Sequence, residues 1–289
     1  MVKSGDAYTC ANLVLTDGAD FYTPYDFTAA QATYSRQPQV YADGSQGWET
    51  LCLPFGGQLR VDDTPLTPVT TGEEGGYWLR RLTGVSGTTL LFSSYETGAD
   101  ASIKAGVPYI IALPGSEFEG ESLEGKAFSV VGTDVTVSMT TNRATADAYT
   151  FGGAYATTPV ATGSSYLLNA DGSLFELQAA DASSAPFRAY ITADTQASTR
   201  GTGSLPPCLS IGNGDGTLTG IESAPATDAD ELRVYGAAGR LVIRTSRPLG
   251  VTVCNMQGQL LWHGTVDGER TLELESGVYV VNGKKGMVR

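Results

Sequence analysis

Residue types that carry out catalysis are few in this 289-residue sequence, and they are not grouped. Its one histidine, His263, lies in the segment LLWHG, so a Ser-His-Asp or Cys-His arrangement has a single candidate base. The sequence contains no G-x-S-x-G elbow, phosphate-binding loop or C-x-x-C pair. One histidine and four scattered cysteines do not give the spacing of a zinc site. We therefore expect no catalytic residue, no cofactor and no metal site.

Carboxylates are the remaining candidates for chemistry, because a glycoside hydrolase needs only two of them across a cleft. The stretch SEFEGESLEG carries Glu117, Glu119 and Glu121 at alternate positions. In an extended segment these side chains lie on one face, where their repulsion is tolerated in water or around a cation. A solvated loop is the favoured interpretation, and a weak calcium site is the alternative.

Aromatic residues support a binding function instead. Phe21, Tyr22, Tyr25 and Phe27 crowd the segment DFYTPYDF, and Tyr77 and Trp78 follow the glycine-containing stretch TTGEEGG. Flat rings on surface loops recognise sugars, because sugar CH groups stack on the ring face while the hydroxyls hydrogen-bond laterally. Filling of the core is the competing use. The ligand-binding candidates are Tyr22, Tyr25, Tyr77 and Trp78.

The composition indicates an acidic all-β protein. The formal charge is −13, and all of it lies before Glu222, since the rest of the chain carries eight acidic and eight basic residues. Such a surface repels nucleic acid, whose phosphates are bound by Lys and Arg. The 36 glycines and 14 tyrosines, with no sustained 3.6-residue periodicity, favour turn-rich β-structure. The sequence contains no run of 18 apolar residues, so we expect no transmembrane segment. The N-terminal stretch MVKSGDAYTC lacks the apolar core of a signal peptide.

Residues 1–205 read as a succession of strands that must hide their apolar faces between two layers. We predict a large β-sandwich or jelly-roll-like domain here. Within it, FTAAQAT from Phe27 is interpreted as extended, and SYLLNADGSLFEL predicts a hairpin in which Gly172 adopts the left-handed conformation. Residues 206–229, which are rich in glycine and proline, are expected to form a linker.

Residues 230–289 break into seven short alternating runs separated by turn signals such as Asp267-Gly268 and Asn282-Gly283. This pattern predicts a small immunoglobulin-like sandwich with seven strands. In its segment GVYVVN, we expect Val278 and Val280 on one face and Tyr279 and Val281 on the other. The four cysteines Cys10, Cys52, Cys208 and Cys254 allow three pairings if all oxidise, and Cys52 reads as a buried free thiol.

The stretches CNMQGQLLWHG (Cys254 to Gly264) and ESGVYVVNGKKGMVR (Glu275 to Arg289) resemble the C-terminal sorting domain of the type IX secretion system of Bacteroidota. Glu275 stands where that family usually has proline. The resemblance implies an immunoglobulin-like sandwich, the outer-membrane export machinery as a partner, and a cell-surface or extracellular location.

The segments CANLVLTDGADFYTP, GWETLCLPF, KAGVPYII and APFRAYI resemble a recurrent module of Bacteroidota surface proteins without assigned chemistry. The expected function is non-enzymatic adhesion or ligand capture, with a glycan or a host or bacterial surface protein as partner. Two alternatives remain open. One is an extracellular carbohydrate-active enzyme or accessory domain, and the other is a structural stalk that presents a further N-terminal domain.

Overall fold

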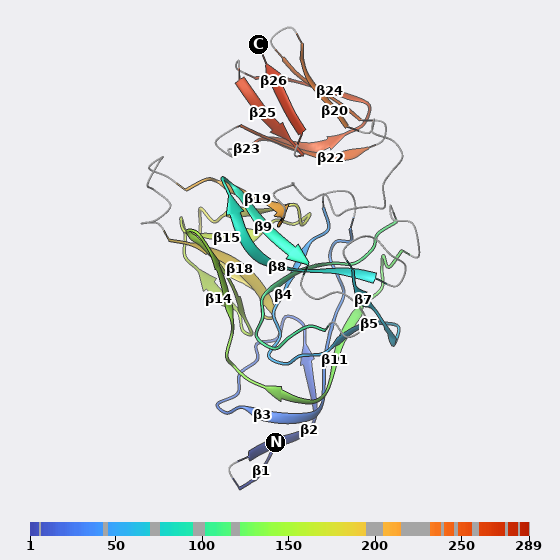
Figure 1. Ribbon diagram of the computed structural model, residues 1–289, viewed down its shortest axis with the longest axis vertical. Coiled ribbons are helices and arrows are strands. Elements are labelled where there is room, and N and C mark those ends of the chain that lie inside the picture. Colours follow the sequence, from blue (N-terminus) through green and yellow to red (C-terminus); the bar gives the residue numbers. More distant parts are fainter. Residues whose placement is uncertain are drawn as a thin grey trace. The chain divides into compact units, whose positions relative to one another are not determined.

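The computed structural model describes residues 1–5, 7–42, 46–69, 76–94, 102–116, 122–194, 205–214, 232–237, 240–245, 248–255, 260–274, 277–282 and 284–288. Every regular element within these ranges is a β-strand, and none is a helix (Figure 1). The expected all-β class is therefore confirmed. These described residues contain no helix that is long and apolar enough to cross a membrane.

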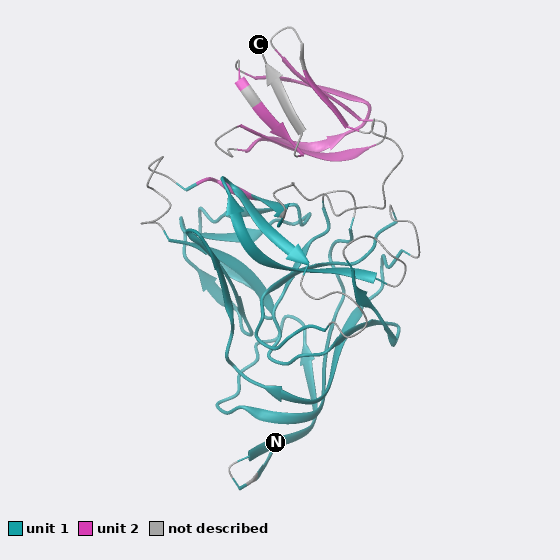
Figure 2. Cartoon of the chain, in the orientation of Figure 1, with its two compact units in different colours: residues 1–205, 210–224 teal, residues 206–209, 225–289 magenta. Residues whose placement is uncertain are grey.

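The chain divides into two compact units, shown in different colours in Figure 2. The first comprises Met1–Leu205 and Ser210–Ala224, and the second comprises Pro206–Leu209 and Pro225–Arg289. The expected linker, 206–229, contains a strand at its start, β19 (Cys208–Asn213), whose residues from Ser210 onward pair with β9 (Thr89–Ser94). The part of that linker from residue 215 to 229 lies outside the described residues.

The described part of the first unit contains two large sheets and a two-stranded one. The six-stranded sheet has the order β1 (Val2–Ser4), β2 (Ala7–Thr16), β3 (Phe27–Arg36), β11 (Phe128–Val137), β5 (Gln58–Val61) and β6 (Thr64–Pro65). The larger sheet has the order β12 (Arg143–Ala146), β13 (Tyr149–Ala154), β18 (Arg188–Ala193), β15 (Ser165–Leu168), β16 (Leu174–Leu177), β19, β9, β8 (Gly76–Ser86), β10 (Tyr109–Ala112) and β4 (Glu49–Leu51), with β7 (Thr67–Pro68) beside β8. β14 (Thr158–Val160) pairs with β17 (Ala182–Ser184).

Strand β3 shows how sequence and packing combine in this unit. Phe27, Ala29, Ala32 and Tyr34 are buried, and the intervening threonine, alanine and glutamine side chains are largely exposed. The strand pairs in parallel with β2 and in antiparallel register with β11, from Val137 opposite Phe27. The extended interpretation of this segment is therefore confirmed. Small alanines are tolerated in it because both neighbouring strands complete its hydrogen bonding.

The two large sheets share one hydrophobic core. It takes side chains from β2, β3, β5 and β11 of the first sheet and from β4, β8 and β10 of the second, together with apolar residues of the connecting segments. Its largest fully buried members include Tyr34, Phe55, Tyr77, Tyr109 and Phe128. Burial explains why these parts of the two sheets pack together, because each has an apolar face to cover. Elsewhere the larger sheet packs on itself, since Phe92 of β9 contacts Phe151 of β13 and Phe175 of β16 at ring-centroid distances of 5.4 and 6.3 Å.

The hairpin expected in SYLLNADGSLFEL joins β15 and β16, with Leu168 opposite Phe175. Gly172 has φ +69°, as the sequence predicts. The Asn169 Oδ1 atom accepts hydrogen bonds from the Ser173 and Leu174 amides at 2.9 and 3.2 Å. A side-chain oxygen thus satisfies the turn amides and fixes the register of the pair.

The described strands of the second unit form a sandwich of three and four strands. One sheet has the order β20 (Leu232–Ala237), β21 (Arg240–Thr245), β24 (Glu269–Glu273), and the other β23 (Leu260–Val266), β22 (Leu249–Asn255), β25 (Gly277–Val281), β26 (Lys284–Val288). Leu241, Ile243, Val251, Val253 and Val281 are fully buried between them. The expected sandwich of seven strands is therefore present among the described residues.

The register of β25 also agrees with the expected alternation. Tyr279 is 6% exposed and Val281 is 0% exposed, and both belong to the sandwich core. Val280 is partly exposed, while the side chain of Val278 lies outside the described part of the chain. Tyr279 therefore contributes to packing in this strand.

Candidate functional site

The candidate binding residues Tyr22 and Tyr25 lie in the segment between β2 and β3. This segment is held in place by hydrogen bonds at several points. The Phe21 amide donates to the Tyr155 carbonyl at 2.9 Å, and Asp20 Oδ1 accepts from the Thr157 amide and hydroxyl at 2.7 and 2.8 Å. The Thr23 hydroxyl donates to the Tyr25 carbonyl at 2.7 Å. The first part of the segment is thus anchored to Tyr155 and Thr157, and a local turn bond constrains the backbone between the two tyrosines.

The rings of these two tyrosines face solvent. Tyr22 is 76% exposed and Tyr25 is 53% exposed. The Tyr25 ring stacks on that of Tyr8 in β2, with centroids 4.5 Å apart and planes 7° from parallel. The Lys3 ammonium group lies 5.5 Å from the centroid of the Tyr8 ring. We call Tyr8, Tyr22 and Tyr25 the tyrosine patch. Tyr22 and Tyr25 supply exposed ring surface, and stacking on Tyr8 partly fixes the Tyr25 ring, which lowers the entropy lost on binding.

The other two candidates are not on the surface, and this corrects the expectation. Tyr77 and Trp78 are both 0% exposed. They lie in β8, which is flanked by β9 and β10 and is buried along residues 76–80. A strand in the interior of a covered sheet buries both faces, so consecutive side chains are enclosed. The two rings therefore fill the core, and a ligand at the surface does not reach them.

The rest of the aromatic segment also divides between surface and core. Phe27 is 4% exposed and belongs to the main core, and Phe21 packs against that core while partly exposed. Only the tyrosines of DFYTPYDF therefore offer most of a ring to solvent. This division follows the strand boundary, since Phe27 is the first residue of β3.

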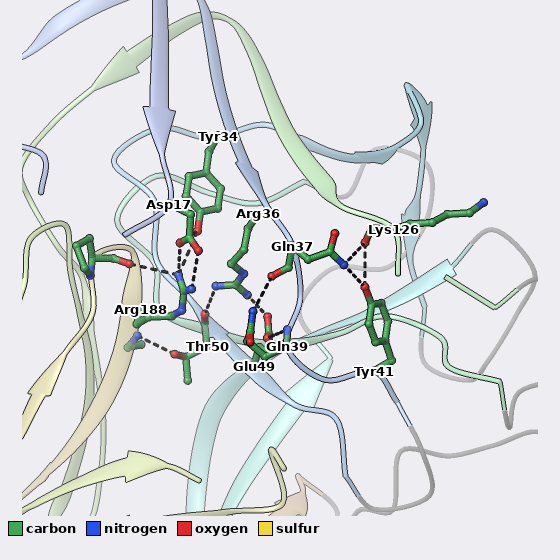
Figure 3. Close-up of polar contacts among 12 residues, drawn as sticks. Asp17, Tyr34, Arg36, Gln37, Gln39, Tyr41, Glu49, Thr50, Lys126 and Arg188 are labelled. Carbon is green, nitrogen blue, oxygen red and sulfur yellow. Dashed lines mark hydrogen bonds and ion pairs between the residues drawn. The ribbon is translucent and has the colours of Figure 1, made fainter. Parts of the chain in front are cut away.

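A network of buried and half-buried charged and polar side chains, which the sequence analysis did not identify, lies in the same unit (Figure 3). The Arg188 guanidinium binds Asp17 through two hydrogen bonds, Nη1 to Oδ1 at 2.8 Å and Nη2 to Oδ2 at 3.0 Å. The Tyr34 hydroxyl donates to the same Oδ1 atom at 2.6 Å. Asp17 follows β2, Tyr34 is on β3 and Arg188 is on β18, so this cluster connects the two large sheets.

The second half of the network is centred on Arg36, whose side chain is 1% exposed. Its Nη2 atom is 2.6 Å from Glu49 Oε2, and its Nη1 atom donates to the Thr50 carbonyl at 3.1 Å. Glu49 Oε1 also accepts from the Gln39 amide at 2.7 Å. The guanidinium lies 5.1 Å from the centroid of the Phe128 ring. Charge pairing and stacking together offset the cost of burying this cation.

The electrostatics of the network favour a structural role over a role in acid catalysis. Burial raises the pKa of the Asp17 carboxyl, but hydrogen bonds from Arg188 and Tyr34, with the nearby guanidinium charges, outweigh burial and leave that pKa below its usual value. Burial likewise raises the pKa of the Tyr34 hydroxyl to about 12. The general acid of a glycosidase needs a carboxyl with a raised pKa. Asp17 has the opposite property and remains an ion-paired acceptor.

The other residues considered for chemistry do not assemble into a site where they are described. His263 is on β23, and its Nδ1 atom is 3.1 Å from the Thr252 hydroxyl on β22. Glu117, Glu119 and Glu121 lie outside the described residues. Within the described ranges, no group of three or more His, Cys, Asp or Glu side chains has the geometry of a metal site.

An open groove of about 640 Å³ runs beside the first strands of the six-stranded sheet. Its lining is mostly small and uncharged, and it consists of Met1, Val2, Thr9, Cys10, Ala11, Asn12, Thr28, Ala30 and Asp134. A single carboxylate in such a groove cannot supply the pair that glycoside hydrolysis requires. The groove therefore adds concave surface to this end of the unit without adding a catalytic pair.

No protein-family model matches the chain. No curated protein matches it at a significant level either.

Proposed function

We propose that the first unit binds a glycan through the tyrosine patch and does not hydrolyse it. The observation that carries this proposal is the exposure of Tyr22 and Tyr25 on a hydrogen-bonded segment, with the Tyr25 ring already stacked on Tyr8. Exposing an aromatic ring to water costs free energy, which is recovered when the ring is covered by the CH-rich face of a sugar. Their placement on a connection between strands is typical of binding sites on β-scaffolds.

The physical basis of affinity in this site is stacking on a surface that needs little reorganisation. Tyrosine has two side-chain torsions, so fixing it against a ligand costs less entropy than fixing a long flexible side chain. For Tyr25, the contact with Tyr8 has already restricted the ring. The tyrosine hydroxyls and nearby backbone groups then provide the lateral hydrogen bonds that distinguish one sugar from another.

Replacing Tyr22 or Tyr25 with alanine is expected to weaken glycan binding about fivefold, because one stacking contact is worth about 1 kcal/mol. Stability should change little, since both side chains are largely exposed. A glycan array screened with the full chain identifies the ligand, and a titration of the variants with that glycan measures the loss. Tyr235→Ala is the matched control, because Tyr235 is 40% exposed but lies on β20 in the second unit. Equal affinity in all three variants would contradict the proposal.

We further propose that the second unit acts as a sorting-type domain that delivers the chain to the cell surface or the extracellular space. The support is the resemblance of Cys254–Gly264 and Glu275–Arg289 to that family, together with a seven-stranded sandwich of the kind such domains have. This function concerns the targeting of the protein, and it is independent of what the first unit binds.

Export gives this second proposal a direct test. The full chain, preceded by an added signal peptide, is expressed in a bacterium with type IX secretion, beside a version that ends at residue 229. We expect the full chain at the surface or in the medium and the shortened chain in the periplasm, both measured by immunoblotting of cell fractions. Equal surface fractions for the two chains would overturn the proposal.

A further inference from the structure

Two of the four cysteines lie next to each other. The Sγ atoms of Cys208 and Cys254 are 3.9 Å apart, although the residues are 46 positions apart in the chain. Cys208 begins β19 within the segment Pro206–Leu209, and Cys254 is on β22, so both belong to the second unit. Cys208 is 3% exposed and Cys254 is partly exposed. The pair is thus largely shielded from solvent.

The local structure of β22 directs the Cys254 side chain toward this contact. Val251 and Val253 are fully buried in the sandwich core, so the alternation of the strand places Cys254 on the opposite face. The pairing with β23 also changes register between Val253 and Cys254. Such β-bulges are known to redirect a side chain.

We propose that Cys208 and Cys254 form a disulfide bond in the mature protein. The bond requires the sulfur atoms to come about 2 Å closer, to the usual length of about 2.05 Å, and a side-chain rotation can supply that movement. In the reaction the two thiols lose two protons and two electrons. A small-molecule or protein disulfide is the oxidant: it accepts both and is released as two thiols, by way of a mixed disulfide.

The surroundings of the other cysteines separate them from this pair. The Cys10 thiol donates to the Asn12 carbonyl at 3.1 Å. The Cys52 thiol is fully buried, and burial raises its pKa to about 12, so it is neither a thiolate nor exposed to an oxidant. Hydrogen bonding to Cys208, followed by burial, raises the pKa of the Cys254 thiol as well. Oxidation is therefore expected during folding, before the pair is enclosed, and reduction of the folded protein is expected to be slow.

The test uses the full chain, unfolded with its thiols reduced and then refolded in a buffer of reduced and oxidised glutathione. The product is quenched, unfolded, alkylated and analysed by mass spectrometry before and after proteolysis. We expect two alkylated thiols, at Cys10 and Cys52, and one linked peptide pair joining Cys208 to Cys254. Four alkylated thiols, or a linkage between any other cysteines, would overturn the proposal.

A pair of variants separates a specific bond from general oxidation. C208S and C254S are each expected to show three alkylated thiols and no internal linkage. Both variants are expected to fold, because an uncharged hydroxyl replaces an uncharged thiol. In the wild type, the oxidised form should unfold about 10 °C above the reduced form, since the bond closes a long loop in the unfolded chain. That difference should be absent in C208S. A new linkage of Cys10 or Cys52 in C208S would show that pairing follows exposure and not the observed contact, which contradicts the proposal.

Discussion

The variant Arg36→Met is expected to lose about 3 kcal/mol or more of unfolding free energy. Arg36 is 2% exposed, and its guanidinium contacts Glu49, the Thr50 carbonyl and the Phe128 ring. Methionine keeps much of the apolar volume but leaves the Glu49 carboxylate, whose side chain is 13% exposed, without its cation. An uncompensated buried charge of this kind typically costs 3–5 kcal/mol, here about the lower figure because the Gln39 amide still binds Glu49. Denaturant unfolding of the full chain measures the loss.

Two further variants make this prediction specific to the buried pair. Arg240→Met removes the partner of Glu273 at a 2.7 Å contact whose side chains are 54% and 78% exposed, and it should cost less than about 1 kcal/mol. The double variant Arg36→Met/Glu49→Gln removes the stranded charge and should recover part of the stability. A loss in Arg36→Met no greater than in Arg240→Met would show that the Arg36 network contributes little.

The variant Gly172→Ala is expected to destabilise the first unit by more than about 3 kcal/mol. Gly172 has φ +69°, which costs a residue with a side chain about 1–2 kcal/mol. A Cβ atom there would also lie 2.1 Å from the carbonyl oxygen and 2.5 Å from the amide nitrogen of Trp48, and backbone atoms cannot move aside cheaply. The turn and the segment before β4 must therefore separate, which breaks the Trp48 to Gly172 hydrogen bond of 3.2 Å.

The matched control for this substitution is Gly163→Ala. Gly163 has φ +75°, and a Cβ atom there meets no atom within 4 Å. It therefore carries the conformational cost alone, and we expect about 1–2 kcal/mol. The difference in midpoint between the two variants in thermal unfolding isolates the close approach at Trp48. Equal midpoints would mean that the hairpin is not held against that segment.

The C-terminal sandwich was predictable because its signals are local. Each strand is a short alternating run, and glycine or asparagine marks several of the turns, as at Gly268 with φ +80° and Asn282 with φ +42°. The Asn282 side chain also bonds across β22, accepting from the Thr252 amide and donating to the Gly250 carbonyl. Local propensity and tertiary contacts favour the same conformation at such positions, and this agreement allows the fold to be predicted from the sequence.

Tyr77 and Trp78 were misread because their strand has no simple apolar pattern. The two aromatic residues directly follow the stretch TTGEEGG, which suggests an exposed loop, and Arg80 and Arg81 come soon after them in the run Gly76–Ser86. In the structure Arg80 is 2% exposed, and its guanidinium lies 5.0 Å from the centroid of the Trp48 ring. Trp48 is far from Arg80 in the sequence, so the partner that permits this burial could not be identified from spacing.

The polar network escaped prediction for the same reason. Asp17 and Arg188 are 171 positions apart, and Asp17 stands in a sequence, TDG, that reads as an ordinary turn. Only the pairing of β2 with β3 and the packing of β18 in the opposite sheet bring the charges together. The exposed tyrosines were predictable because they lie in a polar connection with proline, whereas long-range pairing decides which carboxylates meet.

The most direct test of non-hydrolytic glycan binding is one incubation of the purified full chain with a panel of polysaccharides, in which retained protein and released reducing ends are both measured. We predict retention on at least one polysaccharide, loss of that retention in Tyr22→Ala/Tyr25→Ala, and no new reducing ends. Reducing ends that appear with the wild type and disappear when Glu117, Glu119 or Glu121 is replaced by glutamine would contradict the account. So would retention that is unchanged in the tyrosine variant, or absent on every polysaccharide.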